Sequence, residues 1–213
     1  MSKANGVQVR IARRAERAGM QLHQEVVEAF SAYLGVLAVW NRKMNLTALH
    51  DEDSAIDRLL LEPVAAVRFV PNDATGFLDI GSGAGSPAVP LKVCMPWMRV
   101  WMVESKVRKS AFLQEVIRQL GLEQVEVETC RFEQLVDREE IKRAVDLVTL
   151  RAVRVDAGLW KSLEAFVQPG AWVFLFGGPA PRDRRTIPVT FDVRGDEPLL
   201  GANGSRLLRL RRL

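Results

Sequence analysis

The chain has 213 residues, of which 48% are hydrophobic and 26% are charged, a composition typical of one large globular domain rather than two. It contains no run of about 18 apolar residues, and residues 1–20 lack the apolar segment of a signal peptide, so we expect a cytoplasmic protein with no membrane partner. Its two cysteines and two histidines share no ligand-like spacing, which argues against a disulfide framework and a structural metal site.

The N-terminal third of the chain has a helical pattern. Apolar side chains recur every three or four residues through HQEVVEAFSAYLGVLAVW, residues 23–40. A further helix is expected over residues 55–70, with a kink or break at Pro63, because proline removes a helical hydrogen bond. We therefore expect residues 1–72 to form a helical cap that belongs to the same globule as the rest of the chain.

From residue 73 the pattern changes to short apolar runs that alternate with amphipathic helices. Near-continuous apolar strands separated by helices predict a mostly parallel α/β sheet that is covered on both faces. The strand-like segments around the GANGS turn, VTFDVR and RLLRLRRL, predict a C-terminal antiparallel hairpin, so residues 73–213 should form one Rossmann-like domain. The expected parallel strands are residues 77–80, 99–104, 125–129, 145–150 and 172–176.

The segment FLDIGSGAGSPAVP joins the first expected strand to the first crossover helix. Three alternating glycines, Gly81, Gly83 and Gly85, follow Asp79 near the tip of the strand. Glycines at this place let backbone N–H groups approach a ligand closely, and the N-terminus of the next helix favours negative charge. The segment therefore predicts a ligand crevice at the carboxyl ends of the strands.

Two ligands are compatible with this loop. A dinucleotide matches Gly83, Gly85 and Ala88 in the G-x-G-x-x-A spacing, with Glu104 about 20 residues further on, but it leaves Gly81 unexplained. S-adenosylmethionine accounts for all three glycines, because the aspartate at the first strand tip suits its cationic end and Glu104 suits its ribose hydroxyls. Capping of the following helix is an alternative role for Glu104.

Five segments together resemble a known family, the bacterial 16S ribosomal RNA guanine-N7 methyltransferases (RsmG, or GidB). The resemblance runs from about Trp40 to Gly178 and implies a class I S-adenosylmethionine-dependent methyltransferase fold. It also implies S-adenosylmethionine as the cofactor and 16S ribosomal RNA, or the small ribosomal subunit, as the partner. The segments that carry it are WNRKMNLTAL, GSGAGSPAVPL, MVESKVRKSAFL, CRFEQL and LVTLRAV.

The resemblance also assigns site residues. The family's cofactor contacts fall on Gly81, Ser86, Phe132, Glu133 and Arg151 of this chain. The chain departs from the family pattern at Leu59, Ser86, Ala88 and the Gly177-Gly178 pair, where a histidine, a large apolar residue, a glycine and a nearby lysine are usual. With the residues taken from the glycine loop, the expected cofactor site is Asp79, Gly81, Gly83, Gly85, Ser86, Glu104, Phe132, Glu133 and Arg151.

The chemistry implied by the family needs no general base. Guanine N7 carries a lone pair and no proton, so methyl transfer requires only an in-line approach and relief of the developing charge. We therefore expect no catalytic acid or base residue. A small-molecule methyltransferase would share the cofactor loop, an NAD(P)-dependent enzyme would share the fold, and a non-catalytic RNA-binding module would share the charge; these alternatives stay open.

Positive charge gathers at both ends of the chain. Residues 1–20 carry five cations against one acid, and residues 180–213 carry eight arginines against four acids, which suits a polyanion. Three further cations crowd the first turn of the helix 106–120, where the macrodipole disfavours them and an RNA phosphate would be a partner. We expect a monomer that contacts RNA through Arg42, Asn45, Lys106, Arg108, Lys109 and Arg151.

Overall fold

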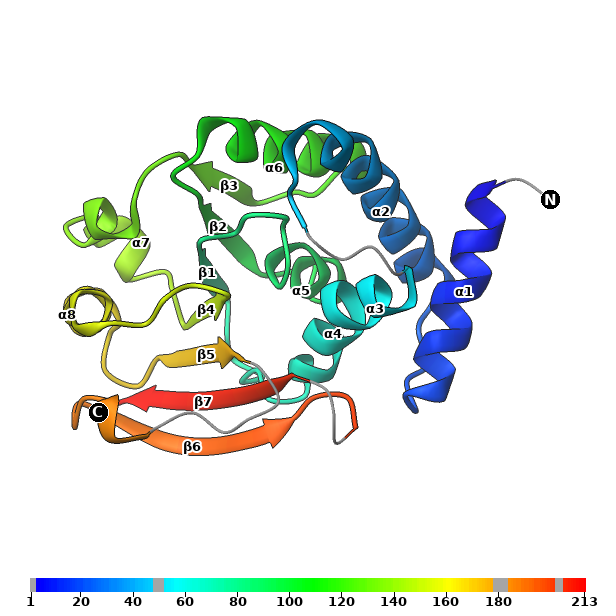
Figure 1. Ribbon diagram of the computed structural model, residues 1–213. Helices are drawn as coiled ribbons and strands as arrows, with labels where there is room; N and C mark the ends of the chain where they lie inside the picture. The colour runs from blue at the N-terminus through cyan, green and yellow to red at the C-terminus, as the bar shows by residue number, and fades with distance from the viewer. Residues whose placement is uncertain (1–2, 48–51, 178–183, 202–204) are drawn as a thin grey trace.

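The computed structural model describes residues 3–47, 52–177, 184–201 and 205–213. Within these ranges, seven strands form one sheet in the order β3-β2-β1-β4-β5-β7-β6 (Figure 1). The first five strands are parallel, and β7 is antiparallel to both β5 and β6, which confirms the predicted parallel sheet with a C-terminal hairpin. The strands are β1 (Gly76–Ile80), β2 (Arg99–Val103), β3 (Val125–Glu128), β4 (Leu147–Arg151), β5 (Trp172–Phe176), β6 (Phe191–Pro198) and β7 (Arg206–Arg212).

Helices cover both faces of the sheet (Figure 1). Alternate residues of the strands supply two separate hydrophobic clusters: Phe77 and Val100 pack with α1, α2 and α4 to α6, whereas Leu78 and Trp101 pack with α8. The helices are α1 (Lys3–Arg17), α2 (Gln24–Met44), α3 (Glu52–Ile56), η1 (Asp57–Leu61), α4 (Glu62–Val67), α5 (Ala88–Cys94), α6 (Val107–Leu120), η2 (Phe132–Leu135), α7 (Glu139–Lys142), α8 (Ala157–Phe166) and η3 (Arg184–Thr186).

The strand boundaries lie close to those expected, with one informative difference at β4. The strand begins at Leu147 rather than Val145. Immediately before it, the Asp146 carboxylate accepts hydrogen bonds from the backbone N–H groups of Thr75, at 2.6 Å, and Gly76, at 3.2 Å. This side chain joins the segments that lead into β1 and β4, so their amino ends stay aligned.

The helix expected over residues 55–70 is interrupted, as Pro63 predicts. Residues 57–61 form a π-helical turn, in which the N–H of Glu62 bonds to the carbonyl of Asp57 and leaves the carbonyl of Arg58 free. Pro63 has no N–H, so the carbonyl of Leu59 also lacks its helical partner. Two backbone acceptors are thereby left without partners inside the helix.

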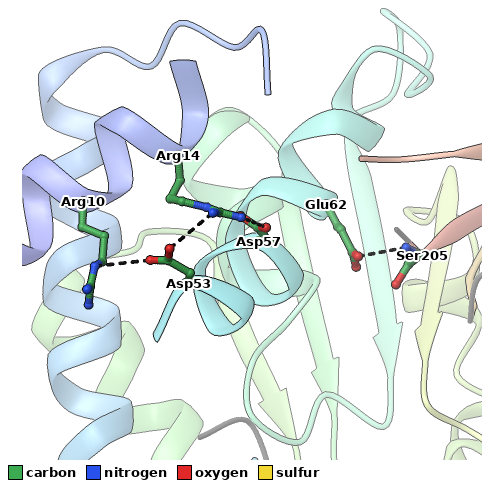
Figure 2. Close-up of polar contacts among 6 residues, drawn as sticks. All are labelled: Arg10, Arg14, Asp53, Asp57, Glu62 and Ser205. Carbon is green, nitrogen blue, oxygen red and sulfur yellow. Dashed lines mark hydrogen bonds and ion pairs between the residues drawn. The ribbon is translucent and has the colours of Figure 1, made fainter. Parts of the chain in front are cut away.

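The N-terminal helix is held to the body by ion pairs. Figure 2 shows Arg10 and Arg14 of α1 reaching Asp53 and Asp57. The Arg10 and Arg14 nitrogens each lie 3.3 Å from an Asp53 oxygen, and Ile11 is fully buried between them. Arg10 and Arg14 therefore have internal partners, which leaves less charge at this end for a polyanion than the composition predicted.

The C-terminal hairpin uses its charges in the same way. Arg206 and Arg209 of β7 pair with acids of β6, and a pair also forms within β6 itself. The register of the hairpin shifts at Arg194, between Val193 and Gly195. Arg211 and Arg212 are the β7 arginines that pair with no aspartate or glutamate in the described part of the chain.

Candidate active site

A cavity of about 230 Å³ lies at the carboxyl ends of β1, β2 and β4. This is the edge at which open parallel sheets bind ligands. Four of the expected cofactor residues line the cavity, and the others lie behind it or beside the glycine loop. The lining residues are Ile80, Gly81, Val103, Glu104, Ser105, Cys130, Arg131, Phe132, Glu133, Val153, Arg154, Asp156 and Leu159.

The three loop glycines have left-handed backbones but different surroundings. Their φ angles are +71° at Gly81, +51° at Gly83 and +88° at Gly85. A Cβ at Gly81 would lie 2.8 Å from Val153 Cγ2, and one at Gly85 would lie 3.0 Å from Val89 Cγ2. At Gly83 it would meet only a backbone oxygen at 3.6 Å, so open space surrounds this glycine alone of the three.

Asp79 lies in β1 with one carboxylate oxygen unsatisfied. The residue is 1% exposed, and Oδ1 accepts a hydrogen bond of 2.6 Å from Thr149 Oγ1. Oδ2 has no hydrogen-bond partner among the residues that the structure describes. Burial raises the pKa of this carboxyl to about 6, against the favourable bond from Thr149. A buried acceptor without a donor is costly, so the site would be stabilised by a cationic or hydrogen-bonding ligand.

Glu104, just beyond β2, bridges the glycine loop and the next helix. One carboxylate oxygen accepts the N–H of Gly83 at 3.0 Å, and the other accepts the N–H of Lys106 at 2.8 Å. The capping role considered from the sequence is therefore present. The same carboxylate lines the cavity, so capping and ligand contact are compatible at this position.

Phe132 and Glu133 lie in η2 on the opposite wall of the cavity. Phe132 is buried and packs edge-on against Phe166, with ring centroids 5.2 Å apart. Glu133 is exposed at the rim. The wall is thus anchored by one aromatic ring, and a polar side chain lies at its edge.

The two carbonyls of the π-helical turn that lack helical partners accept hydrogen bonds from residues of the site. Ser86 Oγ donates to the Leu59 carbonyl at 2.8 Å, and a guanidinium nitrogen of Arg151 donates to the Arg58 carbonyl. Two of the positions that depart from the family pattern, Leu59 and Ser86, are therefore in direct contact. A large apolar side chain at position 86 would not supply this donor.

Arg151, at the tip of β4, is held from three sides. It pairs with Glu62 of α4 at 2.9 Å, and its guanidinium lies 4.7 Å from the ring centroid of Phe176. Its side chain is only 9% exposed, and burial lowers its pKa to about 10. It does not line the cavity as a free cation, so its expected contacts with cofactor and RNA stay predictions.

The other expected RNA contacts lie at or near the same edge. Lys106 and Arg108 are exposed and Lys109 is half-buried, and none of the three forms an ion pair in the described ranges. Arg42 and Asn45 are exposed at the end of α2. Trp40 packs on Phe112 with ring centroids 6.0 Å apart, which brings the end of α2 beside α6.

Several residues of the site were not found from the sequence. Tyr33 of α2 donates its hydroxyl hydrogen to the carbonyl of Ala84 in the glycine loop, and burial raises its pKa far above the ordinary value. The sequence pattern identified it only as a core residue. Thr149 and Glu62 carry a usable signal, because each is a polar residue inside an otherwise apolar segment. The cavity residues Arg154 and Asp156 carry none.

Metal and membrane features are absent from the described residues. No group of three or more His, Cys, Asp or Glu side chains there is placed to hold a metal ion. None of the helices in the described ranges is long and apolar enough to cross a membrane.

Solved structures with the same fold include several methyltransferases. The structure of TrmN from Thermus thermophilus superimposes with a TM-score of 0.56 at 19% identity, covering 81% of this chain and 53% of that one. A SAM-dependent methyltransferase from Aquifex aeolicus gives a TM-score of 0.56 at 15% identity, covering 75% and 93%. These similarities confirm the class I methyltransferase fold.

Sequence relatives are more specific. "Ribosomal RNA small subunit methyltransferase G" of Roseiflexus sp. (strain RS-1) is 38% identical over 135 residues, which are 63% of this chain and 58% of that protein. The protein of the same name from Syntrophotalea carbinolica is 34% identical over 163 residues, which are 76% and 74%. The family model described as rRNA small subunit methyltransferase G matches residues 26–185, so the chain belongs to that family.

Proposed function

We propose that this protein transfers a methyl group from S-adenosylmethionine to N7 of a guanine in 16S ribosomal RNA, acting in the cytoplasm as a monomer. The proposal depends on two features that occur together in a chain of this family. One is the unsatisfied carboxylate oxygen of Asp79, and the other is the open space beside Gly83. The carboxylate and the glycine loop come from one strand and its following turn, so they form a single cradle.

The residues present fit the cofactor. Asp79 Oδ2 suits an ammonium group, because it is a buried acceptor that has no partner in the described part of the chain. The carboxylate of Glu104 lines the same cavity and suits the two ribose hydroxyls. The cofactor, when bound, supplies an electrophilic methyl group. The chain's own contribution is to orient the methyl group, to bury the carboxylates that bind the rest of the cofactor, and to exclude water.

The acceptor requires little more from the chain. Guanine N7 has no proton to remove, so no residue has to act as a base. The exposed cations Lys106 and Arg108, beside the cavity, suit the phosphates on either side of the guanine. The Glu104 carboxylate beside the glycine loop accepts the backbone N–H groups of Gly83 and Lys106, so we assign it to binding rather than to proton transfer.

The test uses small ribosomal subunits from cells that lack the enzyme. They are incubated with the protein and with cofactor labelled in its methyl group, and the RNA is then cleaved chemically at N7-methylguanine. Label at one guanine N7 of 16S RNA is expected. Label at another base atom, or only in a small metabolite, would contradict the proposal and favour a small-molecule methyltransferase. Calorimetry with S-adenosylhomocysteine, NAD and NADP tests the dinucleotide alternative, since only the first should bind.

A further inference from the structure

A second and larger hollow lies at the opposite edge of the sheet from the cofactor cavity. Its volume is about 570 Å³, and it forms where β4 and β5 begin and where β7 ends. Figure 1 shows β7 running antiparallel beside β5, so that its arrowhead meets the start of β5. Trp172, the first residue of β5, is paired in register with Arg211 of β7. We call this hollow the amino-edge groove.

Positive charge dominates the amino-edge groove. Its lining includes five basic residues and two acidic ones. The Asp146 carboxylate is already engaged by the Thr75 and Gly76 N–H groups, and Asp73 forms no ion pair within the described ranges. The groove therefore carries excess positive charge that its own acids do not neutralise.

Two of the cations are free to take an external anion. Lys142 and Arg143 pair with Glu139, at 2.8 Å and 4.0 Å. Arg209 pairs with Glu197. Arg68 and Arg211, by contrast, are exposed and have no carboxylate partner among the residues that the structure describes. Arg211 makes one bond, from Nε to the carbonyl of Gly170 at 3.3 Å, which leaves its terminal nitrogens for another acceptor.

Aromatic rings lie beneath these guanidinium groups. Arg68 and Arg209 lie 4.7 Å and 4.2 Å from the ring centroid of Phe69, and Arg211 lies 5.7 Å from that of Trp172. Phe69 and Trp172 are half-buried rather than enclosed. Cations over partly exposed aromatic rings form the surfaces on which unpaired bases stack, next to phosphate contacts.

We propose that the amino-edge groove binds a single-stranded segment of the substrate RNA, with Arg68 and Arg211 on phosphates and Phe69 and Trp172 beside its bases. The inference rests on the proposed function in that the substrate is RNA. The five-residue strand β4 separates the groove from the cofactor cavity by roughly 13 Å, so the bound segment is not the one that presents the reacting guanine. The groove is therefore a second anchoring site on the same RNA.

The test compares affinities for unmodified 16S ribosomal RNA in filter binding. The double variant Arg68→Ala/Arg211→Ala should lower the affinity by about tenfold, the scale of one to two charge-assisted hydrogen bonds. The logarithm of the association constant decreases with the logarithm of the salt concentration, and this dependence should become less steep by about 1.4. That is about 0.7 for each single-strand phosphate that the variant no longer neutralises. Affinity for S-adenosylhomocysteine should not change, which also shows that the variant is folded.

Two matched variants control for the position of the removed charge and for the guanidinium group that carries it. Lys161→Ala removes one exposed cation from α8, outside the groove, and should leave RNA affinity unchanged. The single variants Arg68→Ala and Arg211→Ala also remove one cation each, but they should lower RNA affinity. Arg68→Lys/Arg211→Lys keeps the charge, so the salt slope should return to that of the unchanged protein. In steady-state kinetics, the double alanine variant should raise KM for RNA and leave kcat unchanged.

The outcomes separate this inference from the proposed function. Equal RNA affinity and equal salt slope in the double alanine variant and in Lys161→Ala would overturn the inference, even where the unchanged protein methylates guanine N7. Selective loss of binding to an acidic peptide, with RNA binding retained, would also overturn it. Failure of the unchanged protein to label 16S RNA would instead count against the proposed function, while a lower RNA affinity of the double alanine variant would still support the groove.

Discussion

The carboxylate of Glu62 lies 2.9 Å from the guanidinium of Arg151, and both side chains are less than a tenth exposed. The other carboxylate oxygen of Glu62 accepts the N–H of Ser205 at 3.0 Å, a contact drawn in Figure 2. One acid of α4 therefore ties together the tip of β4 and the entry to β7. Because Arg151 also bonds to the π-helical turn, this pair connects the helical cap to the active-site edge of the sheet.

Replacing Glu62 by glutamine should destabilise the fold. Removing one partner of a buried ion pair leaves the other charge uncompensated, which costs about 3–5 kcal/mol. Urea unfolding followed by circular dichroism measures the free energy of unfolding of the variant Glu62→Gln. The control is Glu126→Gln, which breaks an exposed pair with Arg99 and should cost less than about 1 kcal/mol. Equal losses in the two variants would show that the buried pair has no special role.

Replacing Gly83 by valine should abolish cofactor binding and leave the domain folded. A Cβ at this position meets no other side chain, so its branches enter the space assigned to the ligand. The matched control is Gly121→Val at the end of α6, where φ is +60° and a Cβ also meets nothing. Both variants carry a backbone strain of about 1–2 kcal/mol. Titration with S-adenosylhomocysteine should show loss of binding only for Gly83→Val; equal affinity in both variants would mean that the glycine serves the turn alone.

Replacing Glu104 by glutamine should reduce both stability and cofactor affinity. The carboxylate accepts two backbone N–H groups, and an amide replaces one of these acceptors with a donor. We expect a loss of about 1–3 kcal/mol in binding S-adenosylhomocysteine, together with a lower melting temperature. Melting curves with and without the ligand measure both effects. A lower melting temperature with unchanged affinity would limit Glu104 to its capping role.

Asp79 should impose opposite pH dependences on stability and on cofactor binding. Its pKa is raised from 3.8 to about 6 in the folded state, so the folded protein holds this proton more tightly than the unfolded chain does. Its contribution to stability is therefore present at low pH and is lost as the pH rises through about 6. A ligand ammonium needs the ionised carboxylate, so affinity for S-adenosylhomocysteine should fall about tenfold between pH 7 and pH 5.

The variant Asp79→Asn provides the control for that prediction. It cannot ionise at this position, so its affinity should be lower at pH 7 and should vary little between pH 5 and pH 7. Calorimetric titrations at several pH values compare the two proteins. The same pH dependence in both proteins would assign the titration to another group.

Much of the fold was predictable because its signals are local. Strand and helix positions follow from the spacing of apolar residues, and the break in the helix expected over residues 55–70 follows from the missing N–H of Pro63. The glycine loop was recognisable because its three residues with positive φ lie within five positions. The chain departs from local expectation mainly at charged residues, since several arginines of the two basic ends form internal ion pairs, among them Arg10, Arg14, Arg206 and Arg209.

The sequence by itself determined the order of strands and helices, the place of the ligand crevice and the two carboxylates beside it, because each depends on neighbours along the chain. Only the tertiary structure decided which distant groups meet. Arg151 and Glu62 are 89 positions apart, and Arg14 lies 43 positions from Asp57. The partner of a long charged side chain depends on how helices pack on the sheet, and periodicity carries no information about that packing. The loss of helical hydrogen bonds near Pro63 is a local effect, so it could be predicted from the sequence. The donors that replace them, Ser86 and Arg151, come from distant segments and could not be predicted.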